Sequence, residues 1–207
     1  MRHYFLSVFA IPLMLAAPLV AQQMPTTPPG APIASRVTAG THTIDGAHTQ
    51  VLFTVNHLGF SNYTGQFAQP SGTLVLDPKN PSRDKVEVTF QIDKVQTTVP
   101  ALDAHLKKPE FFDSTMFPEG KFVSTRVTVK GMTATIAGNL TLKGVTRPVI
   151  LQARFIGAGK APYPPNKTNI GFTATTSIKR SDFGISYGVP LVSDKVDLTI
   201  NAAFEAQ

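Results

Sequence analysis

The chain has 207 residues, 42% of them hydrophobic, and a formal net charge of +6, which suits one domain with a substantial core. It contains no cysteine, and this excludes disulfides, thiolate catalysis and cysteine-containing zinc sites. The 19 basic residues are spread along the chain instead of forming a run, and there is no tryptophan. The composition therefore argues against a nucleic-acid-binding protein.

The first segment predicts a cleaved secretory signal peptide over residues 1–21. Arg2 and His3 form a short basic head, an apolar stretch follows over residues 4–19, and Ala21 offers a small side chain at the cleavage position. The apolar stretch is short and interrupted by two prolines, so it fits a cleaved peptide better than a membrane anchor. We expect a periplasmic or secreted protein.

Residues 22–40 carry four prolines among small and polar residues. Such a segment buries too little apolar area to offset the entropy lost on ordering, so we interpret it as a flexible leader. The folded domain is predicted to cover residues 41–207.

Most of that domain alternates between apolar and polar residues, as in Val86, Val88 and Phe90. A two-residue period predicts strands with one apolar and one wet face. The predicted strands cover residues 42–44, 51–57, 63–67, 73–76, 85–93, 121–130, 132–142, 149–156, 168–179 and 195–204. Lys130-Gly131 is placed to form a tight hairpin between two of them. Their number and spacing favour an all-β antiparallel meander that closes on itself.

One stretch departs from this pattern. Residues 100–112 carry alanine, leucine and charged side chains in an order that fits one or two short helices. The inside of the barrel must be apolar, and periodicity alone leaves open whether it is a packed core or a lipid pocket.

Several ordered segments resemble the YceI-like family of exported, lipocalin-like barrels, and the resemblance covers residues 41–207. The segments are Thr43-Ile44-Asp45-Gly46-Ala47-His48, Gly65-Gln66-Phe67, His105-Leu106-Lys107, Phe111-Phe112-Asp113, Gly138-Asn139-Leu140-Thr141-Leu142-Lys143-Gly144-Val145 and Lys179-Arg180-Ser181-Asp182-Phe183-Gly184. The resemblance implies an extended antiparallel barrel of about eight strands, flanked by short helices, around an apolar tunnel. It also implies a polyisoprenoid or other long-chain amphiphilic lipid as ligand. The family's link to respiratory cytochrome-type membrane proteins points to a quinone-like ligand for some members and leaves a membrane donor or acceptor as a candidate partner.

Nine side chains are predicted to line the tunnel: Phe53, Val55, His57, Phe67, Val88, Phe90, Phe155, Phe172 and Leu198. His57 is in register with Val51 and Phe53, so it points inward. It could hydrogen-bond a lipid head group or a quinone carbonyl, or it could be a core histidine satisfied by a neighbour. No His-x-x-x-His spacing supports a metal site.

Three other groups have two interpretations each. Asp45 and His48 could form an acid/base pair, but they fit better as turn residues. Arg180 could pair with Asp182 across a turn while Phe183 plugs one end of the barrel, or this motif could act as a gate or contact a head group. The aromatic side chains Phe111, Phe112 and Phe117 could cap the barrel mouth or dock the helices.

The sequence thus predicts a binding or carrier protein that sequesters a lipid at equilibrium, with no catalytic residue, no metal and no cofactor apart from the bound lipid. Two alternatives remain. One is an enzyme acting on a lipid, with His57 as its inward reactive group. The other is a ligand-free, stress-protective secreted module with a tightly packed interior.

Overall fold

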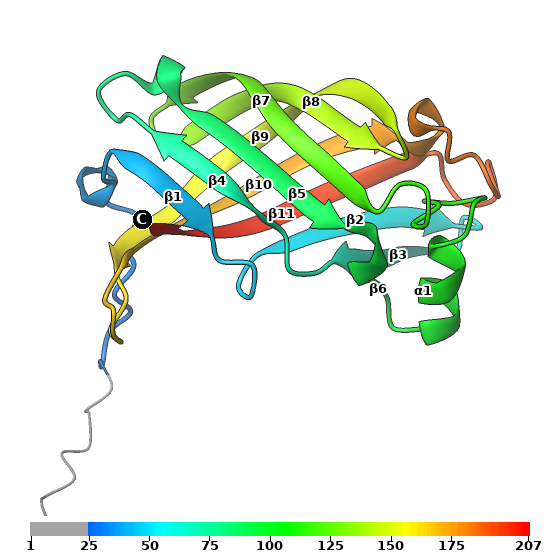
Figure 1. Ribbon diagram of the computed structural model, residues 1–207, viewed down its shortest axis with the longest axis horizontal. Helices are drawn as coiled ribbons and strands as arrows, with labels where there is room; N and C mark the ends of the chain where they lie inside the picture. Colours follow the sequence, from blue (N-terminus) through cyan, green and yellow to red (C-terminus); the bar gives the residue numbers. More distant parts are fainter. Residues whose placement is uncertain (1–24) are drawn as a thin grey trace, which may run out of the picture.

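The predicted two-residue period is realised as a set of long antiparallel strands. In a computed structural model, which describes residues 25–207, the strands curve around one axis (Figure 1). They are β1 (Gly40–Ile44), β2 (Gln50–His57), β3 (Ser61–Phe67), β4 (Ser71–Leu76), β5 (Lys85–Gln91), β6 (Val95–Gln96), β7 (Glu119–Lys130), β8 (Thr133–Leu142), β9 (Val145–Lys160), β10 (Thr168–Lys179) and β11 (Lys195–Ala206). The helix α1 (Pro100–Leu106) follows β6, and 3-10 turns lie at Ala34–Arg36, Pro81–Arg83, Ile92–Lys94 and Arg180–Phe183.

Eight of these strands form a closed barrel. The order around the sheet is β1-β4-β5-β7-β8-β9-β10-β11, and β1 pairs with β11 to close it, with Ile44 opposite Phe204. Strands β2, β3 and β6 extend the same sheet from β11. All of these pairings are antiparallel, so the predicted all-β barrel of about eight strands is confirmed.

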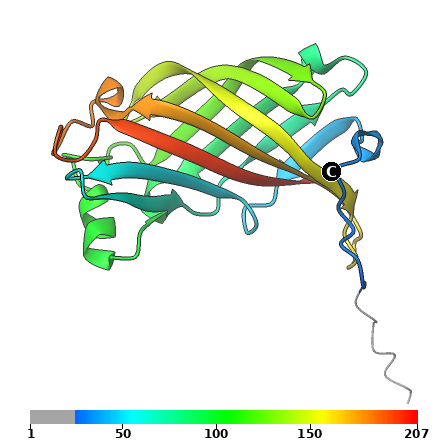
Figure 2. The same cartoon turned by 180° about the vertical axis from the view of Figure 1, so that it is seen from behind.

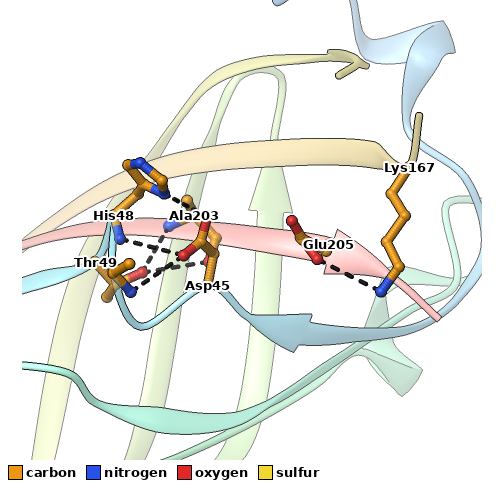
Figure 3. Close-up of polar contacts among 7 residues, drawn as sticks. Asp45, His48, Thr49, Lys167, Ala203 and Glu205 are labelled. Atoms are coloured by element: carbon orange, nitrogen blue, oxygen red, sulfur yellow. Dashed lines mark hydrogen bonds and ion pairs between the residues drawn. The ribbon is translucent and has the colours of Figure 1, made fainter. Parts of the chain in front are cut away.

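The β1–β2 junction lies where β11 changes partners. The Thr49 hydroxyl donates to the carbonyl of Ala203 (3.3 Å) and accepts from its amide (3.0 Å), while the Asp45 amide donates to the same carbonyl (2.9 Å). Figure 3 shows these contacts, together with the nearby Lys167–Glu205 ion pair. Thr49 is buried, and its hydrogen bonds hold the β1–β2 junction on β11. Strands β1 and β2 therefore pair with consecutive parts of the same strand.

The Asp45 carboxylate serves this turn. One oxygen accepts the amides of Ala47 (3.1 Å) and His48 (3.2 Å), and the other meets Nδ1 of His48 at 2.6 Å. The His48 side chain is 77% exposed, and the pair lies outside the barrel interior (Figure 3). Asp45 is therefore a turn residue and His48 a surface residue, as the turn interpretation predicts.

Element bounds differ from the predicted ones where local pattern gave a poor signal. The strand predicted over 85–93 ends at Gln91 and turns at Ile92–Lys94, and β6 was not predicted because two residues show no alternation. The segment 100–112 contains one helix, with proline in its first turn. The β7–β8 hairpin is confirmed, since Lys130 pairs with Thr133 around Gly131, whose φ is 59°.

Part of the proline-rich segment lies along β9. Ala31 donates to the Ala158 carbonyl (3.2 Å), and the Ala158 amide donates back to Ala31 (3.0 Å). Gly157 makes this approach feasible, because a Cβ there would lie 3.1 Å from the Ala31 carbonyl carbon. The start of the domain at residue 41 stays a prediction, and the predicted signal peptide lies outside the described residues. Within residues 25–207, no helix has the length and apolar character needed to cross a membrane.

Candidate functional site

The interior of the barrel contains a cavity of about 630 Å³. Its walls come from β2 to β5, from β7 to β11 and from α1, and almost all lining side chains are apolar. Strand β11 illustrates the cause, because its alternate residues face inward: Val196, Leu198, Ile200, Ala202 and Phe204 all line the cavity. The period-two pattern thus supplies a continuous apolar wall.

The cavity extends between the two ends of the barrel. One end carries α1, the β2–β3 turn and residues 184–193, and we call it the helix end (Figure 1). The other carries the β4–β5 connection and the last residues of β9, and we call it the far end (Figure 2). Lining residues include His57 and Val99 at the helix end and Asp84 and Val129 at the far end.

Eight of the nine predicted tunnel residues line this cavity: Phe53, Val55, His57, Phe67, Val88, Phe90, Phe172 and Leu198. They come from β2, β3, β5, β10 and β11, which the closure of the sheet brings around one space. Their contact with a ligand stays a prediction.

Phe155 is not among the cavity-lining residues, and the prediction for it needs correction. Its ring pairs with Phe172 at a centroid distance of 5.7 Å, and it is buried with Ala158 and Ile170 in a separate cluster. A β-bulge shifts the β9–β10 register between Gly171 and Phe172 and leaves Ile156 exposed. The extra residue, Ile156, follows Phe155 in β9, so Phe155 keeps the inward face that it shares with the cavity-lining Ala153. Its ring packs against Ala158 and Ile170 in the small cluster and does not line the cavity.

Aromatic rings pack over glycines along the cavity wall. A Cβ atom at Gly65 would overlap the Phe53 ring, and one at Gly120 would overlap the Phe90 ring. Phe67 connects the two rings, with centroid distances of 5.6 Å to Phe53 and 4.8 Å to Phe90. Glycine at these two positions lets the large rings pack over the neighbouring strand, where Phe53 pairs with Gly65 and Phe90 with Gly120.

The segment around α1 borders the mouth of the cavity at the helix end. Phe111 and Phe112 both line the cavity, and Phe112 packs edge-on against Phe67 at 5.4 Å. Phe111 also docks α1, since its ring lies 4.9 Å from that of His105. Phe111 thus both lines the cavity and packs against α1, and contact of either ring with a bound lipid chain stays a prediction. Phe117 does not line the cavity and packs against Gly144 in the β8–β9 turn.

His57 lies at the mouth of the cavity and not in the core. It is the last residue of β2 and is exposed, and no hydrogen bond to another described residue involves its side chain. His57 faces the cavity, as predicted. The interpretation as a buried core histidine was wrong, because β2 ends at His57 and leaves its side chain exposed. The imidazole is therefore free to meet a polar group at the opening.

Other polar groups gather at the same end. The Tyr63 hydroxyl bonds Thr98 at 3.3 Å, and hydrogen bonds from Thr97 and Thr98 lower the pKa of Tyr63. Thr97 itself donates to Asp103 at 2.6 Å. Tyr63 and Thr97 both line the cavity beside His57, so hydrogen-bonding groups surround this opening while the walls behind it are apolar.

Arg180 has other partners than the Asp182 carboxylate that the sequence predicted. Its guanidinium donates to four backbone carbonyls, those of Ser193 (2.9 Å), Ile185 (3.1 Å), Tyr187 (2.8 Å) and Val192 (2.9 Å). The predicted pair with Asp182 is not formed, because the 3-10 turn leaves Asp182 exposed. Phe183 is buried in the main core at this end.

Asp194 is the carboxylate close enough to Arg180 to interact with its charge. It accepts hydrogen bonds from the Ser181 hydroxyl (2.7 Å) and amide (2.8 Å). Those bonds, helped by the charges of Arg180 and Lys179, lower the pKa of Asp194, while burial lowers the pKa of Arg180. Together, the hydrogen bonds of Arg180, Ser181 and Asp194 hold residues 180–194, which follow β10, in one conformation.

Asp84 is an acidic residue that lines the cavity at the far end. One of its oxygens accepts the Asp77 amide at 2.7 Å, and burial raises the pKa of Asp84. Within residues 25–207, no three His, Cys, Asp or Glu side chains are grouped so that they could hold a metal ion. What the arrangement supplies is a long apolar space with polar groups at its ends.

Comparisons with known proteins agree with this geometry. The model of the YceI-like domain matches residues 42–204. Protein YceI of Salmonella arizonae is 41% identical over 157 residues, which is 76% of this chain and 81% of that protein. A YceI protein of Campylobacter jejuni with a crystal structure is 30% identical, with a TM-score of 0.65 over 73% of this chain and 90% of that one.

Two more distant structures share the fold. Burkholderia cenocepacia BcnA has a TM-score of 0.69 at 20% identity, over 77% of this chain and 98% of that one. A Saccharophagus degradans domain described as polyisoprenoid-binding and implicated in plant cell wall breakdown has a TM-score of 0.64 at 13% identity, over 82% of this chain and all of that one. With the matched domain spanning nearly the whole barrel and a relative at 41% identity, this chain belongs to the YceI-like family.

Proposed function

We propose that this protein is an exported binding or carrier protein that holds a polyisoprenoid, a quinone or a related long-chain amphiphile in the barrel cavity. The observation that carries the proposal is the cavity itself, about 630 Å³ of space walled by aliphatic and aromatic side chains. Sites for small organic ligands have volumes of roughly 300–1,000 Å³. An interior of this kind argues against the ligand-free module, which requires a packed core.

Hydrophobic transfer would supply most of the affinity. Each methylene group moved from water into such a wall contributes about 0.8 kcal/mol, so a chain of many carbons binds firmly with few polar contacts. His57, Tyr63 and Thr97 at the helix end are the groups placed to meet a polar head. The chain of the ligand would then extend toward the far end.

Two further observations support the proposal. A protein of the same fold is described as a polyisoprenoid-binding domain. The predicted signal peptide over residues 1–21 would deliver the protein to the periplasm or outside the cell, where a shielded lipid needs a carrier through water. The enzyme alternative has less support, because His57 hydrogen-bonds no carboxylate or hydroxyl within the described residues.

The test is native mass spectrometry of the mature protein purified from the exported fraction of its own host, with organic extraction of what it carries. A discrete adduct that extracts as a prenyl or quinone species is the expected result. A bare mass that persists after incubation with such lipids would overturn the proposal.

Two variants locate the ligand in the cavity. Phe172→Glu and Leu198→Glu place a charge on the cavity wall and should abolish lipid retention, because a carboxylate cannot be buried there without a partner. Thr175→Glu, on the exposed outer face of β10, is the matched control and should retain the adduct. Circular dichroism establishes that each variant is folded. Retention by both folded wall variants would contradict binding in the cavity.

A further inference from the structure

Large apolar side chains stand exposed around the mouth at the helix end. They are Leu58 (44% exposed), Phe60 (88%), Tyr187 (55%), Val189 (38%) and Leu191 (65%), and we call this set the apolar rim. None of the five lines the cavity. Exposed apolar side chains that gather in one place commonly mark an interaction site.

The rim comes from two segments that are distant in the sequence and are joined by backbone contacts at this end. The Leu58 amide donates to the Leu191 carbonyl at 2.8 Å, and the Ser193 amide donates to the Asn56 carbonyl at 2.9 Å. His57 and Val192 form an isolated bridge between them. In Figure 1 the tip of β2 and the loop before β11 lie together at the end that carries α1, and the C-terminus lies at the opposite end.

The rim is also held in place. The four carbonyls bound by Arg180 belong to residues 185–193, the segment that carries Tyr187, Val189 and Leu191. The Tyr187 ring is further packed against Phe111 (5.2 Å) and His105 (5.6 Å). These contacts fix the segment in a conformation that presents the apolar side chains to solvent.

Charged residues are absent from the two segments that carry the rim and from the segment 95–102, which lines the same mouth. Residues 57–63, 95–102 and 184–193 contain no Asp, Glu, Lys or Arg, although the whole chain carries 32 such residues (19 basic and 13 acidic). Charged side chains border these segments, since Lys143 donates to the Gly184 carbonyl and the His105–Glu110 pair lies beside Tyr187. A surface that complements the five rim side chains themselves must therefore be apolar. Tyrosine and phenylalanine beside polar groups such as His57 suit the boundary between the head groups and the acyl chains of a bilayer.

The rim is continuous with the cavity. Val99 is 45% exposed and also lines the cavity, and Val192, which follows Leu191, lines it too. A lipid leaving the barrel at this end would therefore pass from the apolar wall to the apolar rim with little exposure to water.

We propose that the apolar rim docks on the surface of an uncharged lipid bilayer, with Phe60 and Leu191 inserted at the acyl boundary and the helix-end mouth facing the membrane. This inference rests on the proposed function, because it assigns the surface from which the cavity is loaded or unloaded. Hydrophobic insertion and not charge attraction drives the contact, so vesicles of phosphatidylcholine alone suffice.

The test is cosedimentation of the delipidated mature protein with phosphatidylcholine vesicles. The wild-type protein should bind, and Phe60→Asp and Leu191→Asp should each lower the partition coefficient at least about tenfold, since a charge replaces an inserted apolar group. Ile150→Asp and Ile156→Asp are the matched controls, because these isoleucines are 55% and 53% exposed on strand β9, away from the helix end. The controls should bind as the wild type does.

Failure of the wild type to bind, or an equal loss in the controls, would overturn the docking inference. A wild-type dimer in sedimentation equilibrium that Phe60→Asp dissociates would overturn it too, because the rim would then bind a second copy of the chain.

A loading assay separates this inference from the proposed function. Geranylgeraniol delivered in detergent micelles should load the rim variants as it loads the wild type, whereas uptake of geranylgeraniol from phosphatidylcholine vesicles should be at least about tenfold slower in them. Equal uptake from vesicles would contradict docking. If the wild type takes up no lipid from either source, the proposed function fails, while vesicle cosedimentation still reports on the rim.

Discussion

At the scale of single residues, Arg180 is a buried cation whose partners are carbonyl oxygens. It is 7% exposed, and four hydrogen bonds to residues 185–193 occupy its planar guanidinium. A lysine ammonium is a compact point charge and cannot serve four acceptors spread in this way. The shape of Arg180, more than its charge, thus holds the loop at the cavity mouth.

We therefore expect Arg180→Lys to lower the free energy of unfolding by about 2–4 kcal/mol, since buried carbonyls lose their donors. Denaturant unfolding followed by circular dichroism measures this loss. Arg154→Lys, at an exposed position on β9, is the control and should change stability by less than about 0.5 kcal/mol. Similar values for both variants would mean that the carbonyl contacts contribute little.

Two carboxylates should show opposite pH dependence. Hydrogen bonds from Ser181 lower the pKa of Asp194, so Asp194 contributes stability above the unfolded pKa, and this stability is lost as the pH falls through the folded pKa. Burial raises the pKa of Asp84, so its contribution is favourable at low pH and is lost as the pH rises through the folded pKa.

Asp194→Asn should thus be less stable than the wild type at pH 7, and the difference should vanish as the pH falls from about 5 to 2. Asp84→Asn should be at least as stable as the wild type at pH 7, because the amide oxygen still accepts from Asp77, and any advantage should disappear near pH 3. Urea unfolding across this pH range gives both curves. Curves of the same sign would refute the assignment.

At the scale of elements, we expect α1 and β6 at the helix end to unfold locally at a lower free energy than the long strands of the barrel. Helix α1 has seven residues and β6 has two. Helices shorter than about 12 residues are marginal in water by themselves, so α1 depends on the contacts of buried Leu106 and of Phe111 and Phe112. Strand β10, by contrast, pairs with β11 from Asn169 to Lys179 and with β9 from Thr168 to Thr175.

Amides in residues 97–117 should therefore exchange with solvent at least about 100-fold faster than those of β10 in hydrogen-exchange mass spectrometry. Loading with lipid should slow exchange over 97–117, where Leu102, Leu106, Phe111 and Phe112 line the cavity, and should leave the rate in β10 unchanged. Equal protection of the two regions in the empty protein would show that α1 is not a separate unit.

At the scale of the whole molecule, closure of the sheet and the filling of its interior are coupled. No disulfide contributes, since the chain has no cysteine, and the main core consists of the same inward faces that bound the cavity. A ligand that binds only the folded barrel stabilises it by mass action, by about 2.7 kcal/mol at a hundredfold excess over Kd.

Removal of the bound lipid should then lower Tm by roughly 5–10 °C, given about 2–4 °C for each kcal/mol in a domain of this size. Differential scanning calorimetry of the protein before and after extraction, and again after reloading, measures the shift. Leu198→Glu serves as the control, because a barrel that cannot retain lipid should show no shift. An unchanged Tm in a wild type that demonstrably carries lipid would contradict this coupling.

The sequence by itself determined the all-β class, most strand positions and the inward set from Phe53 to Leu198, because a period of two fixes which face each side chain takes. The number and spacing of the strands also indicated a closed barrel, and the resemblance added the ligand tunnel inside it. Phe155 was misassigned because a period of two predicts that its ring faces inward but not that Ala158 and Ile170 pack against it there. His57 was taken for a residue that could be buried, because periodicity gives direction and not depth.

Only the tertiary structure decided the distance between opposite walls, and with it that a cavity remains. That distance depends on closure through pairs such as Ile44 with Phe204, which no local pattern encodes. The same holds for the carbonyl partners of Arg180 and for the rim, where Leu58 meets Leu191 only because β2 and β11 are neighbours. The local two-residue period decides which side of the sheet each side chain is on, and the long-range pairing of strands decides which residues it contacts there.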